Sequence, residues 1–431
     1  MNKTLQECPE SPVWAREDAF PEAPQGWGWL DPKGHFHPCE SLDSLHAAIR
    51  DDRDGSVDLV WTPTQGRMIL PEELPGVSDA LRSARDRWTR NDLAEAKYRL
   101  RWFGAMLAGF SSYAFLGGLS FANRLAEQSS GEVDLSQRLF FAARAGLSSH
   151  YVGLTVLGFI IFAFIPWYQA RKRRAELSHW TEAGISEIAP TIRFETWLER
   201  QKAPMTKVFL SLLAAVALAQ LASGVRSNGW SSLLAIFQPW DGTAVAGLMK
   251  ERYLQGEWWR LFTAPFLHGN IVHFVMNASA LAYLGKRMEV FARWPHLPLV
   301  FLFAASLGGE ASARLIAAPS VGASGGLLGW LGFLLVFETL HKSLVPRPAR
   351  RRLLAGVALI GLIGLVGFRY IDNAAHAGGL LAGMLYAIVV FPKSSAAARP
   401  RSNSTDRIAG GISLGLLVTA AAFTAFQLLR R

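Results

Sequence analysis

Residues 321–337 read VGASGGLLGWLGFLLVF and contain no charged side chain. The hydrocarbon core of a bilayer is roughly 30 Å thick, and about 20 helical residues cross it. This stretch is therefore predicted to be a transmembrane helix, with Ser324 in a glycine-rich turn at its start. Further uncharged apolar windows lie at residues 102–123, 145–170, 208–225, 261–285, 294–309, 353–368, 373–392 and 408–429. No soluble chain shows such a pattern over a comparable length, so the sequence predicts an all-α polytopic membrane protein.

The spacing of these windows divides the chain into four predicted parts. Residues 1–95 are charged and rich in Trp and Pro, which favours a small soluble α+β domain. Residues 96–204 hold a two-span hairpin and a basic linker, and residues 205–392 hold a compact core of six spans. Residues 393–431 hold a linker and an extra C-terminal span. In the first part, residues 27–49 (WGWLDPKGHFHPCESLDSLHAAI) weakly resemble GYF-type adaptor modules, which implies a cytoplasmic partner or an assembly role.

The net charge of +10 is spread beside the apolar windows and forms no single basic patch. It therefore indicates membrane orientation, and no nucleic-acid partner is expected. With the N-terminus in the cytoplasm, the connectors on that side hold 20 Lys and Arg, against 9 on the opposite side. This bias predicts a cytoplasmic N-terminus. The first residues include acidic side chains and form no apolar run, so neither a signal peptide nor a transit peptide is predicted. We therefore expect the protein in a bacterial plasma membrane.

Ser324 and His376 are the first candidates for chemistry. Glycines at 322 and 325 let the backbone turn sharply around Ser324, although Ser and Gly also serve to pack membrane helices. His376 lies in DNAAHAGGLLAG (372–383), and an ionisable side chain in a span is costly unless it faces a partner or a cavity. The predicted topology puts both residues at the same outer end. Small-xxx-small patterns, Gly325 to Gly329 and Gly379 to Gly383, predict close approach of their two helices.

A second polar group lies in HGNIVHFVMN, residues 268–277. His273 and Asn277 are four residues apart, so they share one helical face and are predicted to point their N–H groups at a developing oxyanion. Three histidines, at 268, 273 and 376, leave a zinc site as an alternative. The chain contains no HExxH motif, however, and we expect neither a metal nor another cofactor. For His268 a structural hydrogen-bonding role is favoured over catalysis.

These motifs together resemble the rhomboid family of intramembrane serine proteases. GEWWR (256–260), HGNIVHFVMN, GASGG (322–326) and DNAAHAGGLLAG follow the family's order and approximate spacing over residues 205–392. The resemblance implies a six-helix core, Ser324 as nucleophile, His376 as its base, and His273 and Asn277 as oxyanion donors. His268, Gly322, Trp259 and Arg260 would support the site, the last two through loop structure.

The chain departs from the family pattern at one position beside the site. Leu328 stands where some members carry an aromatic side chain that stacks on the histidine. The packing of His376 is therefore either looser or supplied by another residue such as Trp330. Asp372 precedes His376 by four residues and is expected to be a loop or cap residue.

The resemblance implies an intramembrane endopeptidase whose partners are the lipid bilayer and the transmembrane helix of a single-span protein, cleaved near the outer leaflet. The alternative is a catalytically silent rhomboid-like protein that binds transmembrane clients. A transporter or channel would need ionisable residues strung through the midplane. The one intramembrane charged pair that the sequence indicates is Glu310 with Arg314, spaced i, i+4 at a helix end.

Overall fold

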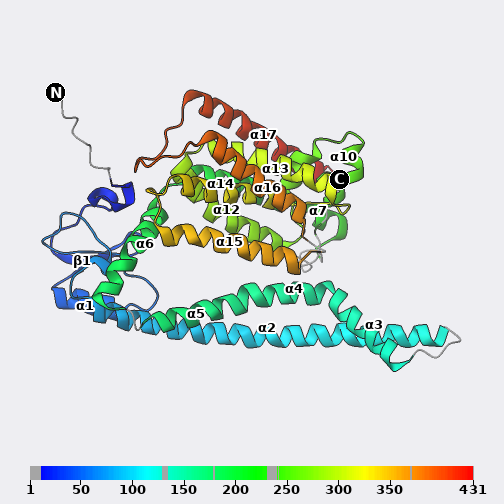
Figure 1. The fold of residues 1–431 in the computed structure, drawn as a ribbon, viewed down its shortest axis with the longest axis horizontal. Helices are drawn as coiled ribbons and strands as arrows, with labels where there is room; N and C mark the ends of the chain where they lie inside the picture. Colours follow the sequence, from blue (N-terminus) through cyan, green and yellow to red (C-terminus); the bar gives the residue numbers. More distant parts are fainter. Residues whose placement is uncertain are drawn as a thin grey trace. The chain divides into compact units, whose positions relative to one another are not determined.

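The computed structural model describes residues 11–128, 134–177, 180–230, 240, 242–368 and 371–430. These residues form two compact units, which are described separately below (Figure 1). One unit comprises residues 11–19, 193–361 and 371–430, and the other comprises residues 20–192 and 362–368, apart from the gaps just given.

The second unit begins with a small sheet. Strands β1 (Trp27–Leu30), β2 (Phe36–Cys39) and β3 (Leu59–Trp61) pair antiparallel in the order β2-β1-β3. Helix α1 (Leu42–Asp51) starts where Ser41 accepts a hydrogen bond from the backbone N–H of Ser44, a capping box that satisfies a free helix-end donor. A short 3₁₀ turn, η3 (Pro71–Glu73), follows the sheet. The predicted small strands around one helix are confirmed.

Helix α2 (Ser78–Gln128) runs for 51 residues from this sheet domain onward. Its first turns supply Ala80 and Leu81 to the buried core that also holds Leu45 and Val60. The predicted boundary at residue 95 therefore falls within a continuous helix. Figure 1 shows α2 as one long rod, and it packs against α3 (Leu135–Ser148), α4 (His150–Gly158) and α5 (Ile165–Glu176).

The predicted single span at residues 145–170 was wrong at its start. Ser149 has an extended backbone (φ −70°, ψ 122°) and separates α3 from α4. From α4 the helix continues through a π-helical segment, η4 (Phe159–Phe164), into α5. Pro166 lies at the start of α5. Because proline lacks an N–H and its ring clashes with the carbonyl four residues earlier, the preceding turn widens.

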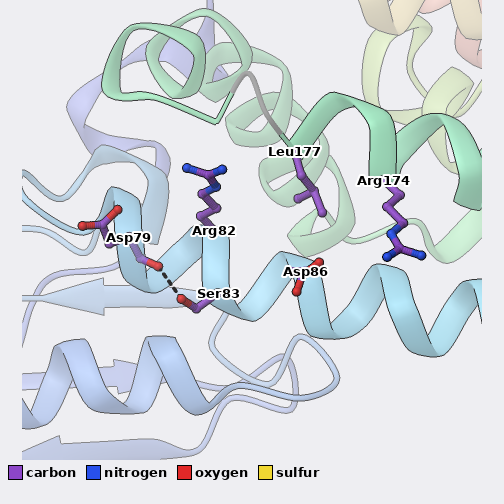
Figure 2. A pocket seen from close by; sticks show the side chains of 6 residues that line it. All are labelled: Asp79, Arg82, Ser83, Asp86, Arg174 and Leu177. Atoms are coloured by element: carbon purple, nitrogen blue, oxygen red, sulfur yellow. Dashed lines mark hydrogen bonds between the residues drawn. The ribbon is translucent and has the colours of Figure 1, made fainter.

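An open polar hollow of about 490 Å³ lies against α2 and α5 in the same unit. Figure 2 shows the side chains that line it: Asp79, Arg82, Ser83, Asp86, Arg174 and Leu177. Ser83 Oγ donates to the carbonyl oxygen of Asp79, an ordinary bond within the helix. The hollow therefore combines acidic and basic side chains and contains no serine–histidine pair.

The first unit is helical. Two 3₁₀ turns, η1 (Val13–Ala15) and η2 (Glu17–Ala19), belong to it, and α6 (Glu182–Arg200) joins the two units along the chain. Its remaining elements are α7 (Pro204–Asn228), α9 (Thr243–Ala246), α10 (Lys250–Leu254), α11 (Arg260–Thr263), η6 (Ala264–Phe266), α12 (Ile271–Ala292), α13 (His296–Leu315), α14 (Ser324–Leu340), α16 (Asn373–Val390) and α17 (Ser404–Leu429). Helix α15 (Arg347–Val366) belongs to it up to residue 361.

Four helices of the described residues are long and apolar enough to cross a membrane by length and composition: the 78–124 part of α2, α7, α16 and α17. Helix α14 is a shorter apolar helix of the same kind. Helices α12, α13 and α15 carry charged side chains near their ends. The predicted helical membrane fold is confirmed. Helices α12 and α13 extend beyond the C-terminal ends of their apolar windows, and α15 begins six residues before its window.

Helices α14 and α16 lie in backbone contact through glycines. A Cβ placed on Gly379 would lie 2.1 Å from the carbonyl oxygen of Gly325, and one on Gly383 would lie 1.8 Å from that of Gly329. No side chain fits at either position, since real Cβ atoms essentially never approach closer than 3.0 Å. The predicted small-xxx-small contact is therefore confirmed. Figure 1 shows α13 beside this pair, and α13 contacts both helices.

A buried ion pair joins the far end of α14 to α12. Arg287 Nε and Nη2 donate to the two carboxylate oxygens of Glu338 at 2.6 and 2.9 Å, and neither side chain is exposed by more than 1%. The Glu310–Arg314 bridge is present as well. The sequence indicated only the Glu310–Arg314 pair, and the described residues add the Arg287–Glu338 pair. Arg287 and Glu338 are 51 residues apart, so no local spacing connects them.

Helix α17 packs on α7 and α13 and belongs to the same unit as they do. Gly410 lies so close to Pro295 that a Cβ there would be 2.7 Å from the Pro295 Cα. At the other end, Arg226 Nη1 of α7 donates to the carbonyl oxygen of Leu429 at 2.9 Å. The appended helix is thus an integral part of this unit.

We predict that Gly383→Ala lowers the stability of the protein by about 1–3 kcal/mol, because the added methyl group forces two backbones apart. The matched control is Gly415→Ala in α17, where a Cβ meets nothing within 4 Å. Thermal unfolding in detergent measures both. Equal midpoints for the two variants would contradict the glycine contact.

Candidate active site

Ser324 is the first residue of α14, so its backbone N–H has no partner within the helix. The turn before it depends on Gly322, whose φ of 123° lies in the region that favours glycine. A Cβ on Gly322 would lie 2.6 Å from His273 Cε1 and 2.7 Å from His273 Nε2. Gly322 is therefore needed both for the backbone turn and for the close position of the His273 ring.

His376 lies in the first turn of α16. Asp372 caps this helix, because its side chain accepts from the backbone N–H of Ala375 at 2.9 Å and its carbonyl oxygen accepts from that of His376. The cap expected for Asp372 is thereby confirmed. His376 Nε2 lies 2.8 Å from Ser324 Oγ, within hydrogen-bond distance. His376 Nδ1 is buried and has no hydrogen-bond partner among the described residues.

His273 and Asn277 lie on α12, facing the start of α14. Asn270 caps this helix by accepting from the backbone N–H of His273 at 2.9 Å. The Asn277 Nδ2 atom is buried, has no partner in the described part of the chain, and lies 3.5 Å from the Cβ position of Gly322. The structure thus brings together the N–H of Ser324, the ring of His273 and a free amide donor of Asn277.

His268 is fully buried, and its backbone is held by α7. Its N–H donates to Gln220 Oε1 at 2.9 Å, and its carbonyl oxygen accepts from Gln220 Nε2 at 3.1 Å. Its ring contacts those of His273 and Phe274 edge to face. Both ring nitrogens of His268 are buried and have no hydrogen-bond partner among the described residues, so the hydrogen-bonding role predicted for this side chain is not seen. Gln220 was missed by the sequence analysis, because a glutamine in an apolar helix 48 residues away carries no local signal.

Trp259 and Arg260 hold the loop beside the site. Arg260 is 1% exposed, donates to the carbonyl oxygen of Gly247 at 2.7 Å, and lies with its guanidinium 4.5 Å from the Trp259 ring centroid. The Trp259 ring meets Phe423 of α17 edge to face at 5.5 Å. Both side chains therefore shape the loop, and neither lies between Ser324 and His376.

Trp330 is committed to helix packing. Its Nε1 donates to the carbonyl oxygen of Leu297 at 3.0 Å, and its ring packs edge to face on Phe209 and Phe301. The suggestion that Trp330 replaces the missing aromatic beside His376 is therefore not supported, while Leu328 is itself buried.

The three histidines considered for zinc do not gather into a metal site. Within the described ranges, no group of three or more His, Cys, Asp or Glu side chains is placed to hold a metal ion. The arrangement instead offers a hydroxyl beside an imidazole, with donors around it, which are the parts that nucleophilic acyl transfer uses.

Comparison with known proteins places this site in a recognised domain. Residues 255–393 match the family model described as a Rhomboid domain. The chain is similar to Rhomboid protease GluP of Bacillus subtilis (strain 168), with 35% identity over 157 residues, which are 36% of this chain and 31% of the relative. It is 34% identical to RHOMBOID-like protein 6, mitochondrial, of Arabidopsis thaliana over 143 residues, 32% of this chain and 46% of the relative.

A further relative carries a different description. Inactive rhomboid protein 2 of Homo sapiens is 30% identical over 139 residues, 32% of this chain and 16% of that protein. The chain thus spans less than half the length of each of these relatives. The family model covers the part of the chain from α11 to α16.

We predict that Gly322→Ala slows labelling of Ser324 by a fluorophosphonate at least tenfold, because the methyl group displaces the His273 ring. The matched control is Gly256→Ala, which has a similar φ of 108° but open space around its Cβ position. Both variants lose roughly 1–3 kcal/mol of stability to backbone strain. Equal labelling rates at equal loss of thermal stability would contradict the role of Gly322 at the site.

Proposed function

We propose that this integral membrane protein, whose residues 255–393 belong to the rhomboid family, is an intramembrane serine endopeptidase. The observation that carries the proposal is the 2.8 Å hydrogen bond between Ser324 Oγ and His376 Nε2. The free N–H groups beside it supply the second requirement of acyl transfer, which is a place for the oxyanion.

The proposed reaction starts from neutral His376 with its proton on Nδ1, so that Nε2 accepts. Ser324 Oγ attacks the carbonyl carbon of the scissile peptide bond while Nε2 takes the hydroxyl proton. The oxyanion lies near the N–H of Ser324, with the side chains of His273 and Asn277 as further donors. His376 then protonates the leaving amine, and water, activated by the same histidine, releases the acyl group and regenerates the serine.

The proposed substrate is the transmembrane helix of a single-span protein, which enters from the bilayer and unwinds near the outer surface. The proposed orientation has the N-terminus in the cytoplasm of a bacterium and the Ser324 end of α14 toward the outside. The positive-inside bias of the connectors supports this orientation. The sheet domain would then meet a cytoplasmic partner.

The second candidate is a catalytically silent rhomboid-like protein that binds client helices. The observation behind this candidate is the similarity of the chain to Inactive rhomboid protein 2. The two candidates differ in one respect that can be measured, because a silent protein needs no hydrogen bond between the serine and the histidine. The presence of this bond favours the protease.

We predict that the purified protein in detergent cleaves a labelled single-span substrate, and that Ser324→Ala and His376→Ala each lower kcat roughly 1,000-fold or more. Removing either partner eliminates the nucleophile or its base. Ser413→Ala, a buried serine of α17, is the matched control. Cleavage that survives at a normal rate in either site variant would overturn the assignment, and binding without cleavage by the unmodified protein would favour the silent candidate.

We predict that Asn277→Ala lowers kcat by about 100- to 1,000-fold, because one oxyanion donor is typically worth that much. KM and the thermal midpoint should change little, since Asn277 Nδ2 bonds to no described residue in the free protein. Steady-state kinetics separate the two parameters. A rise in KM at constant kcat would assign Asn277 to substrate binding instead.

A further inference from the structure

A buried polar cluster lies behind the serine–histidine pair. It consists of Lys250, Ser312, Ser320 and Asp372, here called the Lys250 cluster. Lys250 Nζ donates to Ser320 Oγ at 2.8 Å and also to Ser312 Oγ. Both hydroxyls in turn donate to Asp372 Oδ2, which lies 3.8 Å from Lys250 Nζ. Each serine therefore bridges a cation and a carboxylate.

The cluster is well enclosed, with Lys250 only 6% exposed and the Asp372 side chain 17% exposed. Burying an isolated charge is costly, and the cost falls when the charge is paired and its hydrogen bonds are filled. Here the Ser312 and Ser320 hydroxyls donate hydrogen bonds to Asp372 Oδ2, and the backbone N–H of Ala375 donates one to Oδ1. Removing either charge leaves the other buried without its counterpart.

The cluster reaches both reactive residues through the backbone. Asp372 caps the first turn of α16 and accepts the N–H of His376, as described above. Ser320 lies four residues before Ser324 and pairs with Leu248 by two backbone hydrogen bonds of 2.9 and 3.2 Å. Lys250 itself lies in the outer loop, on α10. One cation thus ties the loop, the approach to Ser324 and the start of the His376 helix together.

We propose that Lys250 is a positioning residue, whose buried charge holds Asp372 and Ser320 and thereby sets the distance between Ser324 and His376. The inference rests on the proposed function for its catalytic meaning. Lys250 touches neither the reacting atoms nor the predicted oxyanion donors, so it acts through the backbone of its neighbours. In the sequence analysis it counted only as one of the basic residues of a connector.

The titration of the cluster gives this role a signature. Burial lowers the pKa of Lys250 to about 8, although Asp372 acts to raise it. Burial acts to raise the pKa of Asp372, but hydrogen bonds from Ser312, Ser320 and Ala375 and the charge of Lys250 outweigh it and hold the value below normal. The other charged or titratable groups beside the cluster pair elsewhere or are exposed. Tyr253 and Arg314 pair with Glu310, Arg260 with Glu257, and His376, which also feels the charge of Asp372, with Ser324; Glu251 and Arg252 face solvent.

Loss of the Lys250 proton should therefore reduce reactivity without unfolding the protein. Because the pKa of Lys250 is lower in the folded state than its ordinary 10.5, the unfolded chain holds the proton more tightly between these values. The contribution of Lys250 to stability consequently rises from about pH 8 toward pH 10.5. If Lys250 acts by positioning, the labelling rate should fall as the pH rises above 8, while the thermal midpoint should not fall because of Lys250. A purely structural role would not separate these two measurements.

The experiment measures the rate of fluorophosphonate labelling of Ser324 in the full-length protein between pH 6.5 and 9.5. We expect a fall of about tenfold with a midpoint near pH 8 in the unmodified protein, and the same fall in the control Lys207→Met, an exposed lysine of α7. In Lys250→Met we expect a rate about tenfold lower at pH 7 and no alkaline fall. An alkaline fall that persists unchanged in Lys250→Met would overturn the proposal.

A double-variant cycle tests the pairing directly. Lys250→Met and Asp372→Asn are each expected to lower the labelling rate about tenfold at pH 7, and Asp372→Asn keeps an oxygen for the helix cap. The double variant should label only about tenfold more slowly than the unmodified protein, no slower than either single variant, because both changes disable the same unit. A combined loss near one hundredfold would show independent effects and contradict the cluster as a single device.

Failure of the proposed function can be told apart from failure of this inference. If Ser324 of the unmodified protein neither labels nor cleaves, the protease assignment fails. Hydrogen exchange over residues 373–377 still tests the cluster, since Lys250→Met should speed exchange there relative to Lys207→Met. Equal exchange in the two variants would overturn the positioning role.

Discussion

Backbone contact between α14 and α16 is the constraint on which the candidate site depends. In a bilayer no hydrophobic effect drives two apolar helices together, so their association relies on close packing and polar contacts. The glycines at 379 and 383 bring the α16 backbone against carbonyl oxygens of α14, where a methyl group has no room. Ser324 and His376 lie at the same end of these helices, and the hydrogen bond between them follows from this approach. Ser324 is therefore placed by helix packing as much as by its own turn.

Polar groups inside the unit act as clamps between segments that are distant in the sequence. Arg287 and Glu338 lock α12 to the far end of α14, and Glu289 accepts from the backbone N–H groups of Met205 and Thr206 at the start of α7. The Lys250 cluster likewise joins α10, the segment before Ser324 and the start of α16. A buried charge is costly when unpaired, so each clamp resists separation of the segments it joins. The apolar helix faces supply close contact, and the clamps fix which ends meet.

The sequence predicted the helical class, the glycine contact and the residues now found at the site, because each leaves a local signature. Uncharged windows of about 20 residues indicate transmembrane helices, and residues four positions apart lie on the same helical face. Gln220, Lys250 and the Arg287–Glu338 pair were missed because their partners lie 48 or more residues away and no periodicity links them. The start of the second span was misplaced for a related reason. Composition across residues 145–149 is uniformly apolar or small, whereas the extended backbone at Ser149 interrupts the helix.

Helix α2 has a mechanical consequence for the sheet domain. Its 51 residues measure roughly 76 Å at 1.5 Å per residue, far more than the bilayer core of about 30 Å. The residues before the apolar window at 102 therefore extend into water as a continuous rod of about 35 Å. Because Ala80 and Leu81 of this rod are buried in the core of the sheet domain, the domain cannot swivel as it would on a glycine-rich tether. Any rotation of the sheet domain must therefore turn α2 with it, including the apolar part of the helix.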